Sequence, residues 1–449
     1  MSHPRQFAQP PLAFIPPDFD LNVMRVARAI LPFWMRRSTS IADIEAVNIE
    51  QLAELYHQFQ SGKVRLLLAF RHPSAADPFA MMYLMHYLLP RAARRQRIYL
   101  KSPTHAHFMY DRGIPLWAGS WVGWVYSKLG GTPIHRGKLD RTGLKSARDL
   151  LANGRFPLMA APEGATNGHN EIISPLEPGI AQMGFWCVED LQKADRTEQV
   201  IIVPIGLQYS YVKQSWEQVD QLLHTLEIDT GIQPKTPDRY IRLYAIAEHM
   251  LTVMESFYEK FYHQILPSVE NAEPNTRLAL RLQNLLDSAL AVAEQYFNVP
   301  PKGTVIDRCR RLEQAAWDLI YRDDLKLGEL SAVDRGLADR VAEEASLRVW
   351  HMRLVESFVA VTGKYVIEKP SLDRFSETTL LLWDMITRIK GGNAFKRPKL
   401  GKKSVVVTIG TPISVSDRAA VYQSNRRAAK QAVSDLTQEL QVAMEKMIF

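Results

Sequence analysis

The chain has 449 residues, of which 46% are hydrophobic, and its formal net charge is +7 at pH 7. This length allows a large core in two domains, or in one domain with a large insertion, and the composition excludes a disordered or fibrous protein. The two cysteines, Cys187 and Cys309, lie far apart and outside any Cys-x-x-Cys arrangement. They argue against a disulfide framework or a structural zinc site and fit a reducing compartment.

The basic charge suits an anionic membrane, the phosphates of coenzyme A or nucleic acid. No zinc-finger spacing, RNA-binding strand motif or base-reading helix is present, so we expect no nucleic-acid partner. The N-terminal residues have no secretory pattern. Residues 113–127 form the longest stretch without Asp, Glu, Lys or Arg, and its 15 residues fall short of the roughly 20 that a spanning helix needs. We therefore expect no signal peptide and no transmembrane helix, but a peripheral protein on the cytoplasmic face of a membrane.

Residues 21–37 predict an amphipathic helix that ends near Pro32. Its apolar side chains recur at helical spacing, at Leu21, Met24, Ala27, Ile30 and Leu31. Arginines lie between and after them, and Phe33 and Trp34 follow, which is the mixture that an interfacial helix uses. A surface helix packed on its own domain has the same pattern, so both interpretations stay open.

Between residues 64 and 212, short apolar runs alternate with helical patterns. Strands are predicted at 64–70, 97–103, 131–137, 156–164 and 200–212. Helices are predicted at 77–90, 116–130, 140–154 and 177–193. This alternation indicates an α/β fold, in which a mixed sheet is flanked by helices.

The pattern changes after residue 212. Residues 213–402 are mostly long helical patterns and predict a large helical insertion before the last strand. Residues 403–449 predict that strand and a terminal helix, which return to the α/β domain. The predicted organisation is therefore a helical region at 1–63 with a membrane-surface helix, an α/β domain at 64–212, the insertion at 213–402, and the final strand and helix.

His72 and Asp77 stand out by their context. His72 follows the apolar strand 64–70, and Asp77 opens the next helix beside Pro78, a residue favoured in the first helical turn. Both side chains should therefore lie at the carboxyl edge of the sheet, where α/β proteins bind ligands. A neutral histidine can take the proton of a hydroxyl, and a carboxylate on its other nitrogen fixes the tautomer.

The His-x-x-x-x-Asp spacing alone is weak evidence. It recurs at His135 with Asp140, in a strand-like run, and at His224 with Asp229, in a helical stretch. For the first pair, the alternative is that Asp77 only caps the helix, since Asp is a preferred cap.

Three further blocks follow predicted strands. Arg136, in residues 131–137, could bind a phosphate as a fork or form a surface ion pair. Glu163 and Gly164 could contact an acceptor hydroxyl or belong to a plain turn. Pro204 interrupts the strand 200–212, which usually marks an edge or a bulge.

In this order, the four blocks resemble the glycerolipid acyltransferase family, which includes bacterial and plastid lysophosphatidic acid acyltransferases. The matching segments are 72–77, 130–137, 162–164 and 203–206, with the strand that begins at 403. The resemblance implies that His72 and Asp77 are the catalytic dyad, and that Arg136, Glu163 and Gly164 bind the acceptor. It also implies that acyl-CoA or acyl-carrier protein is the donor and co-substrate; no other cofactor is expected.

The chain departs from that pattern twice. Arg71 stands before the histidine where the family often has Asn, and Gly164 is followed by Ala165, Thr166 and Asn167 instead of Thr-Arg. The missing Arg puts glycerol-3-phosphate and lysophosphatidic acid in doubt as acceptors. The Thr-Asn ending is similar to relatives that acylate lysophospholipids, and we expect Thr166 to contribute to the acceptor site.

Other features stay secondary. The aromatic residues in 115–126 could face lipid, but we expect them in the core because Trp is highly buried on average. His105 and His107, without a carboxylate pair, predict no metal site. Two basic clusters could bind anionic headgroups or be solvated. The first consists of Arg91, Arg94, Arg95, Arg97 and Lys101, and the second of Lys396, Arg397, Lys399, Lys402 and Lys403.

The predicted function is thus transfer of a fatty acyl group to a hydroxyl of a glycerolipid or lysophospholipid, with a membrane lipid surface as partner. The alternative is a non-catalytic lipid-binding or scaffold protein on the same fold. Retention of both His72 and Asp77 argues against that alternative.

Overall fold

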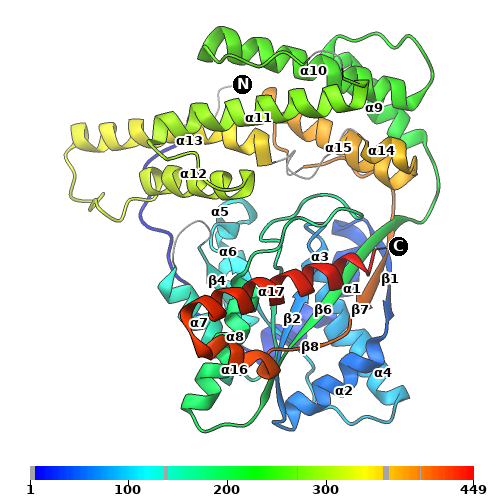
Figure 1. Cartoon of the computed structure of the whole chain (residues 1–449), viewed down its shortest axis with the longest axis vertical. Coiled ribbons are helices and arrows are strands. Elements are labelled where there is room, and N and C mark those ends of the chain that lie inside the picture. The colour runs from blue at the N-terminus through cyan, green and yellow to red at the C-terminus, as the bar shows by residue number, and fades with distance from the viewer. Residues whose placement is uncertain (1–5, 136–139, 270–271, 357–363, 395, 449) are drawn as a thin grey trace. The chain divides into compact units, whose positions relative to one another are not determined.

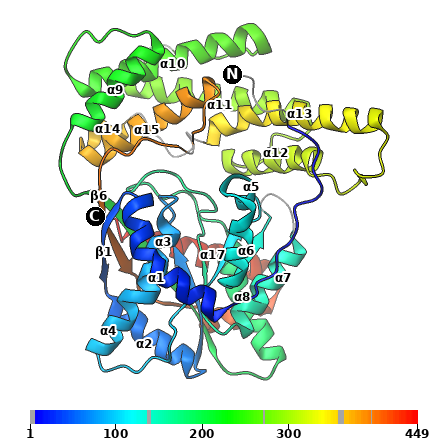
Figure 2. The same ribbon diagram turned by 180° about the vertical axis from the view of Figure 1, so that it is seen from behind.

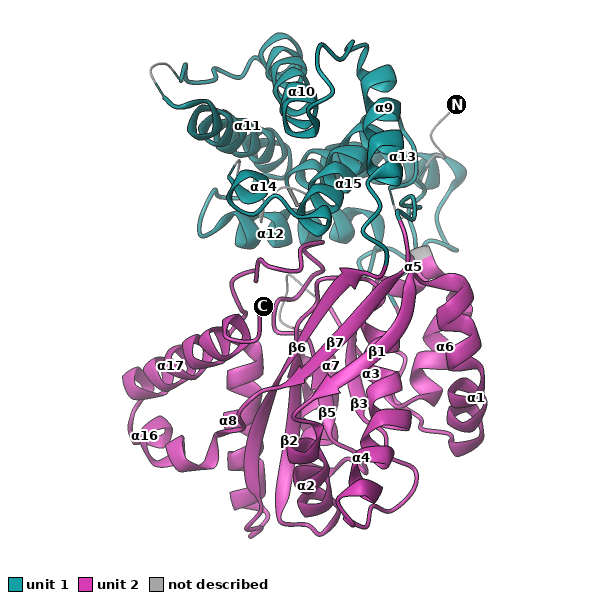
Figure 3. Ribbon diagram, turned by 90° about the vertical axis from the view of Figure 1, so that its right-hand side faces the viewer, with its two compact units in different colours: residues 1–12, 136–138, 213–400 teal, residues 13–135, 139–212, 401–449 magenta. Residues whose placement is uncertain are grey.

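The structure is a computed structural model and describes residues 6–135, 140–269, 272–356, 364–394 and 396–448. The chain divides into two compact units, which Figure 3 colours separately. Residues 13–135, 139–212 and 401–449 form an α/β unit, and residues 1–12, 136–138 and 213–400 form a helical unit. Each unit has its own core, and each is described by itself.

The α/β unit contains a mostly parallel eight-stranded sheet in the order β1-β7-β6-β2-β5-β3-β4, with β8 paired to β6. Only β6 pairs antiparallel with its neighbours β7 and β8; the other described pairings are parallel. The predicted mixed sheet flanked by helices is confirmed. The strands are β1 (Ile41–Val47), β2 (Val64–Phe70), β3 (His107–Asp111), β4 (Gly131–Ile134), β5 (Leu158–Ala160), β6 (Gln199–Tyr211), β7 (Lys403–Ile409) and β8 (Ile413–Ser414).

Helices cover both faces of this sheet, as Figures 1 and 2 show from opposite sides. One face is covered by α1 (Leu21–Ser38), α2 (Ile49–Gln60), α3 (Asp77–Tyr83), a π-helical turn (Leu84–Leu88) and α4 (Leu89–Arg95). The other is covered by α7 (Arg141–Asn153), α8 (Gly179–Lys193), α16 (Ala419–Ser424) and α17 (Arg426–Glu445). The remaining short helices are α5 (Ile114–Ala118), α6 (Ser120–Lys128) and a 3-10 turn (Ser416–Arg418).

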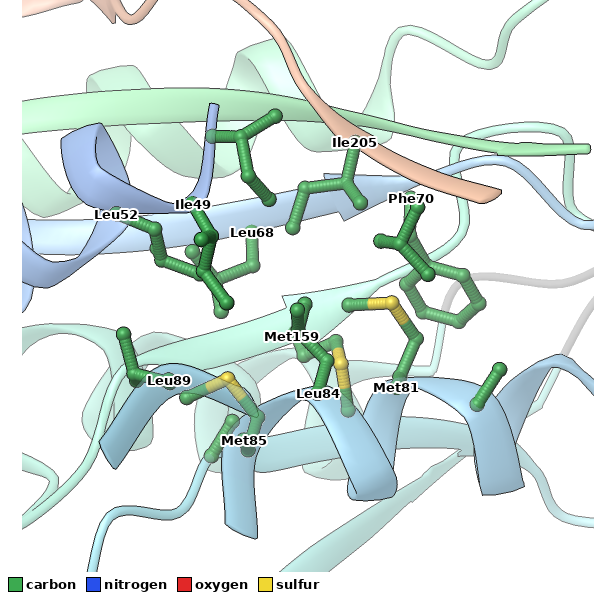
Figure 4. Packing of buried hydrophobic residues seen from close by; sticks show 14 of the residues in the cluster. Ile49, Leu52, Leu68, Phe70, Met81, Leu84, Met85, Leu89, Met159 and Ile205 are labelled. Carbon is green, nitrogen blue, oxygen red and sulfur yellow. The ribbon is translucent and has the colours of Figure 1, made fainter. Parts of the chain in front are cut away.

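Strand β2 lies at the centre of this packing. All seven of its residues are buried, and alternate side chains enter opposite cores. Leu68 and Phe70 face Met81 of α3 and Leu84 of the π-helical turn that follows α3 (Figure 4). Because β2 is fixed on both faces and both edges, the residues directly after Phe70 start from a rigid position.

The helical unit confirms the helical stretch predicted to precede the strand at residue 403, which is β7. Its helices are α9 (Glu217–Thr230), α10 (Arg239–Tyr262), α11 (Pro274–Phe297), α12 (Val305–Ile320), α13 (Ala332–Glu356), α14 (Tyr365–Glu368) and α15 (Leu372–Ile389). Buried acidic side chains in it are paired: Arg242 holds Glu227 through two hydrogen bonds of 2.7 and 2.9 Å. Such pairing offsets the cost of removing a carboxylate from water.

Two predicted elements near the N-terminus need correction. The helix at 21–37 does not end near Pro32 but continues through it to Ser38. The region 1–63, predicted to be helical, also contains strand β1, which runs parallel to β7. Only Ile41 and Ile44 of β1 are buried, so it lacks the alternating pattern that identifies a strand.

The strand predicted at 97–103 is wrong, and the strand in this part of the sheet is β3 at His107–Asp111. Side chains of α2 hold the backbone of 97–103 instead. Gln60 donates to the Lys101 carbonyl at 2.8 Å and accepts from its N–H at 2.8 Å, and a His57 ring nitrogen lies 3.0 Å from the Tyr99 carbonyl. An apolar run therefore forms a loop because its hydrogen bonds go to a neighbouring helix.

Pro204 does not mark a sheet edge or a bulge. It lies inside β6, opposite Ala69 of the central strand β2. On its other side the partner strand is interrupted, since β8 pairs with Ile201 and Ile202 and β7 pairs from Ile205 onward. The missing N–H of Pro204 thus falls where no strand residue would accept it.

The expectation that the aromatic stretch belongs to the core is wrong for two of its residues. Trp121 and Trp124 of α6 are 60% and 55% exposed, and Leu116 of α5 is 50% exposed. Helices α5 and α6 meet at Gly119, whose φ of +106° permits the break between them.

Candidate active site

His72 lies just beyond the carboxyl end of β2. The pairing of β2 with β6 extends one residue further, because the Arg71 N–H donates to the Ile205 carbonyl at 2.9 Å. The chain then leaves the sheet at His72 and enters α3 at Asp77, with Pro78 in the first turn. The sequence-predicted placement at the carboxyl edge of the sheet is therefore what the structure shows.

His72 and Asp77 form a direct contact. His72 Nδ1 lies 2.9 Å from Asp77 Oδ2, and because a carboxylate only accepts, Nδ1 carries the proton. Asp77 is completely buried, while the His72 side chain is 22% exposed. The Nε2 edge has no hydrogen-bond partner among the described residues, so an unprotonated nitrogen is available to a substrate.

Asp77 does not act as a simple helix cap. No side-chain cap hydrogen bond is present at the start of α3. Instead, Asp77 Oδ2 accepts from the Ser74 N–H at 2.8 Å, and Oδ1 accepts from the Tyr209 hydroxyl of β6. Burial, and then the charge of Asp77, raise the pKa of Tyr209 well above its usual value, so the hydroxyl stays a donor.

Glu163 lies behind the histidine. Its Oε1 accepts from the His72 backbone N–H at 2.7 Å, and its Oε2 accepts from the Ser174 N–H at 3.0 Å and from Asn167 at 3.1 Å. Its side chain has no exposed surface. Burial raises the pKa of this carboxyl, and the nearby Arg71 guanidinium works against that rise. Both oxygens are thus turned to protein donors rather than to solvent.

Arg71 ties the second loop of the site to the first. Its buried guanidinium donates to the carbonyls of His169 at 3.1 Å, of Ile172 at 2.8 Å and of Asn170. Its Nε lies 3.9 Å from Glu163 Oε1. One cation therefore fixes both the 163–172 loop and the carboxylate that holds His72.

The other predicted acceptor residues lie in or near this loop. Gly164 has a φ of +73°, which a glycine adopts without strain and which lets the chain turn at the end of β5. Thr166 is exposed, and the neighbouring Asn167 turns inward to Glu163 and Ile172. Arg136 lies outside the described residues.

The two repeated spacings do not form dyads. Asp140 caps α7 and accepts from the backbone N–H of His135 at 2.9 Å, and it also pairs with Arg112. The His224 side chain is 68% exposed and lies 3.8 Å from Glu227. Context, not spacing, distinguishes His72.

No metal centre is evident in the part of the chain that the structure describes. No three His, Cys, Asp or Glu side chains there are placed to hold a metal ion. His105 and His107 point to separate carbonyls, those of Leu129 at 2.8 Å and Gly130 at 3.0 Å.

Tyr209, Ser74 and Ser174 complete the site and are absent from the sequence prediction, which names Asn167 only as part of the departure from the family pattern. Tyr209 comes from a strand 132 residues after Asp77, and its only signal is a tyrosine within an apolar strand, where a buried hydroxyl requires a partner. The loop residues are ordinary turn formers in the sequence, and only the fold turns them toward Glu163.

An α/β sheet that presents a carboxylate-oriented histidine at its strand ends can deprotonate a hydroxyl. Residues 43–208, which contain the dyad and the Glu163 loop, match the family model described as acyltransferase. This domain therefore belongs to the glycerolipid acyltransferase family, whose members move an acyl group from a donor to an acceptor. No match was found among curated proteins or among solved structures.

Proposed function

We propose that the protein transfers a fatty acyl group from acyl-CoA or acyl-carrier protein to a hydroxyl of a glycerolipid or lysophospholipid. His72 is the general base, and Asp77 orients it. The observation that carries this proposal is the His72–Asp77 contact of 2.9 Å, with the Asp77 side chain completely buried and 22% of the His72 side chain exposed.

The chemistry follows from that geometry. His72 Nε2 takes the proton of the acceptor hydroxyl while the oxygen of that hydroxyl attacks the thioester carbonyl. The ester C–O bond forms, the C–S bond breaks, and the thiolate leaves with the proton that the imidazolium returns. Asp77 keeps the Nδ1 tautomer and stabilises the imidazolium, so no protein nucleophile is needed.

We assign different parts to the other residues. Glu163 positions the backbone of His72 instead of binding the acceptor, because its oxygens already accept protein donors. Gly164 and Thr166 remain candidates for contact with the acceptor, and Arg136 for contact with an acceptor phosphate.

The N-terminal helix supports a peripheral membrane location. Helix α1 packs on the domain through Met24, Leu31 and Met35, which are buried. Its other side exposes Val26 (58%), Ile30 (50%), Phe33 (68%) and Trp34 (44%). Arg25 and Arg36, also exposed, flank them, a combination that favours an anionic bilayer surface. None of the described helices is long and apolar enough to cross a membrane.

The deciding experiment is acyl transfer from labelled acyl-CoA and acyl-carrier protein to a panel of lysolipids and glycerol-3-phosphate, with products identified by mass. His72→Ala should lower turnover by about 10²–10⁴-fold and leave the far-ultraviolet circular dichroism unchanged. His224→Ala, at an exposed repeat of the spacing, is the matched control and should keep full activity. A folded wild-type protein without transfer to any acceptor would favour the non-catalytic alternative, and equal losses in the two variants would remove the dyad.

A further inference from the structure

Helices α5 and α6 present an uncharged, apolar surface on the α/β unit. From Gly113 to Ser127 the chain has no Asp, Glu, Lys or Arg, yet part of this segment faces solvent. Leu116, Trp121 and Trp124 are 50%, 60% and 55% exposed. The two tryptophans are three residues apart in α6 and therefore share one face of the helix. Large apolar side chains that are exposed together mark an interaction site.

The end of α6 is joined to the start of α1. The Asp18 N–H donates to the Ser127 carbonyl at 2.9 Å, and the Asp20 N–H donates to the Lys128 carbonyl at 2.8 Å. The Asp20 side chain then caps α1. Helices α1 and α6 contact each other and lie on the same side of the unit, as Figures 2 and 3 show. The exposed apolar side chains of the two helices therefore belong to one side of the α/β unit.

Both helices also border the edge of the sheet at which His72 lies. Strands β2, β5 and β3 run parallel, so α5, which follows β3, begins at the edge where β2 ends. Strand β1 runs parallel to β7, which is antiparallel to β6, and β6 is parallel to β2. Strand β1 therefore begins where β2 ends. The last turns of α1, with Phe33 and Trp34 exposed, lead into β1 and lie at that same edge.

The charges on this side of the unit match an anionic bilayer. Helices α1, α5 and α6 contain no Asp or Glu, and their cations are the four arginines of α1 and Lys128. The two carboxylates just before α1 are engaged, since Asp18 pairs with Lys128 and Asp20 caps the helix. Tryptophan favours the interface between membrane and water, and arginine binds lipid phosphates. A second copy of the chain on this surface would bring like charges together, which disfavours it as the partner.

We propose that α5 and α6, together with α1, bind an anionic lipid bilayer and hold the His72 edge of the sheet against it. A lipid acceptor then reaches the imidazole without crossing water. The inference extends the proposed peripheral location from α1 to a second element, and it rests on the proposed function only in the use of a lipid acceptor.

The test uses the full-length protein and vesicles of phosphatidylglycerol and phosphatidylcholine, with binding measured by flotation and hydrogen exchange. Vesicles should protect amides of α1, α5 and α6, but not those of α7 and α8 on the other face of the sheet. Trp121→Glu should weaken vesicle binding at least about tenfold, because it replaces an apolar contact with a charge that anionic lipid repels.

Val421→Glu is the matched control. Val421 is 60% exposed, as Trp121 is, and it belongs to α16 on the other face of the sheet. This variant should bind vesicles as the wild type does. His72→Ala should also bind them equally well, because the bilayer contact does not involve the dyad.

Three results would overturn the proposal: no vesicle binding, exchange protection confined to α1, or equal binding by the two glutamate variants. A dimer that sediments without lipid and dissociates in Trp121→Glu would identify a second copy as the partner and would also overturn it. Exchange protection in the wild-type protein decides the question if Trp121→Glu fails to fold. Protection of α5 and α6 by vesicles without acyl transfer to any acceptor would support this surface and refute the proposed reaction.

Discussion

Tyr209→Phe tests how the buried carboxylate governs the histidine. The substitution removes the hydroxyl that donates to Asp77 Oδ1 and keeps the ring that packs in the core. A buried charged acceptor that loses a donor costs about 1.5–3 kcal/mol in unfolding free energy. We therefore expect a loss of that size in urea denaturation.

The same change should slow transfer only moderately. Asp77 Oδ2 keeps its contact with His72 Nδ1, so the carboxylate still fixes the tautomer, although Oδ1 loses its donor. The value of kcat should therefore fall less than about tenfold, against the loss of about 10²–10⁴-fold expected when the base itself is removed.

Tyr110→Phe is the matched control. Tyr110 is also buried in the α/β unit, but its hydroxyl has no hydrogen-bond partner in the described part of the chain. Its removal should change neither the stability nor the rate by a comparable amount. An unchanged stability in Tyr209→Phe, or a rate loss as large as that of His72→Ala, would refute the role assigned to Tyr209.

Three other outcomes are expected. Burial lowers the pKa of His105 to about 3 and that of His86 to about 4, and it also lowers the pKa of His107. The unfolded chain therefore binds protons below about pH 6.5 that the folded chain does not. His105 and His86 should each cost about 1.4 kcal/mol of stability between pH 7.5 and 5.5. His86→Met should reduce that loss in urea titrations at the two pH values, and an unchanged pH dependence would contradict it. Phe33→Glu should release the protein from anionic vesicles, whereas Tyr99→Glu, at a loop position that is 76% exposed, should not. High salt or alkaline carbonate should also remove the wild-type protein from membranes. Retention of the wild-type protein through both washes would argue for an integral segment. Arg136→Ala should raise KM for glycerol-3-phosphate or lysophosphatidic acid about tenfold to a hundredfold, because a charged hydrogen bond contributes about 1.5–3 kcal/mol. The effect on KM for lysophosphatidylcholine should be smaller. A variant whose KM values for all three acceptors equal those of the wild type would remove Arg136 from the acceptor site.

The sequence predicts the dyad because both residues adjoin elements with strong local signals. A continuous apolar strand ends before His72, and Pro78 marks the helix start beside Asp77. The sequence does not predict Tyr209 as a third member, since that contact depends on β6 pairing beside β2. Strand β1 is missed for a related reason: its hydrogen bonds go to β7, more than 350 residues away, and long-range pairing leaves little local pattern.

Whether a side chain is buried is equally hard to predict from the local sequence. The apolar pattern of 115–126 is compatible with a core helix, yet the fold leaves Trp121 and Trp124 exposed. Conversely, Arg71 reads as a surface residue and is 1% exposed. Only the convergence of the His169, Asn170 and Ile172 carbonyls on one point makes a buried guanidinium favourable.

That buried arginine connects the two departures of this chain from the family pattern. Arg71 donates to carbonyls of the 163–172 loop from inside the domain. Glu163 pairs with Arg71 and accepts from Asn167, so the polar groups of both residues are used in the same buried network. Among residues 163–167, Thr166 is the exposed side chain, and it carries a hydroxyl but no charge. The loop can therefore contribute a neutral hydrogen bond to an acceptor, but no cation to a phosphate. The charge of a terminal phosphate on the acceptor must therefore be bound by residues outside this loop. A lysophospholipid whose phosphate is esterified carries less charge there and needs fewer cations in the site.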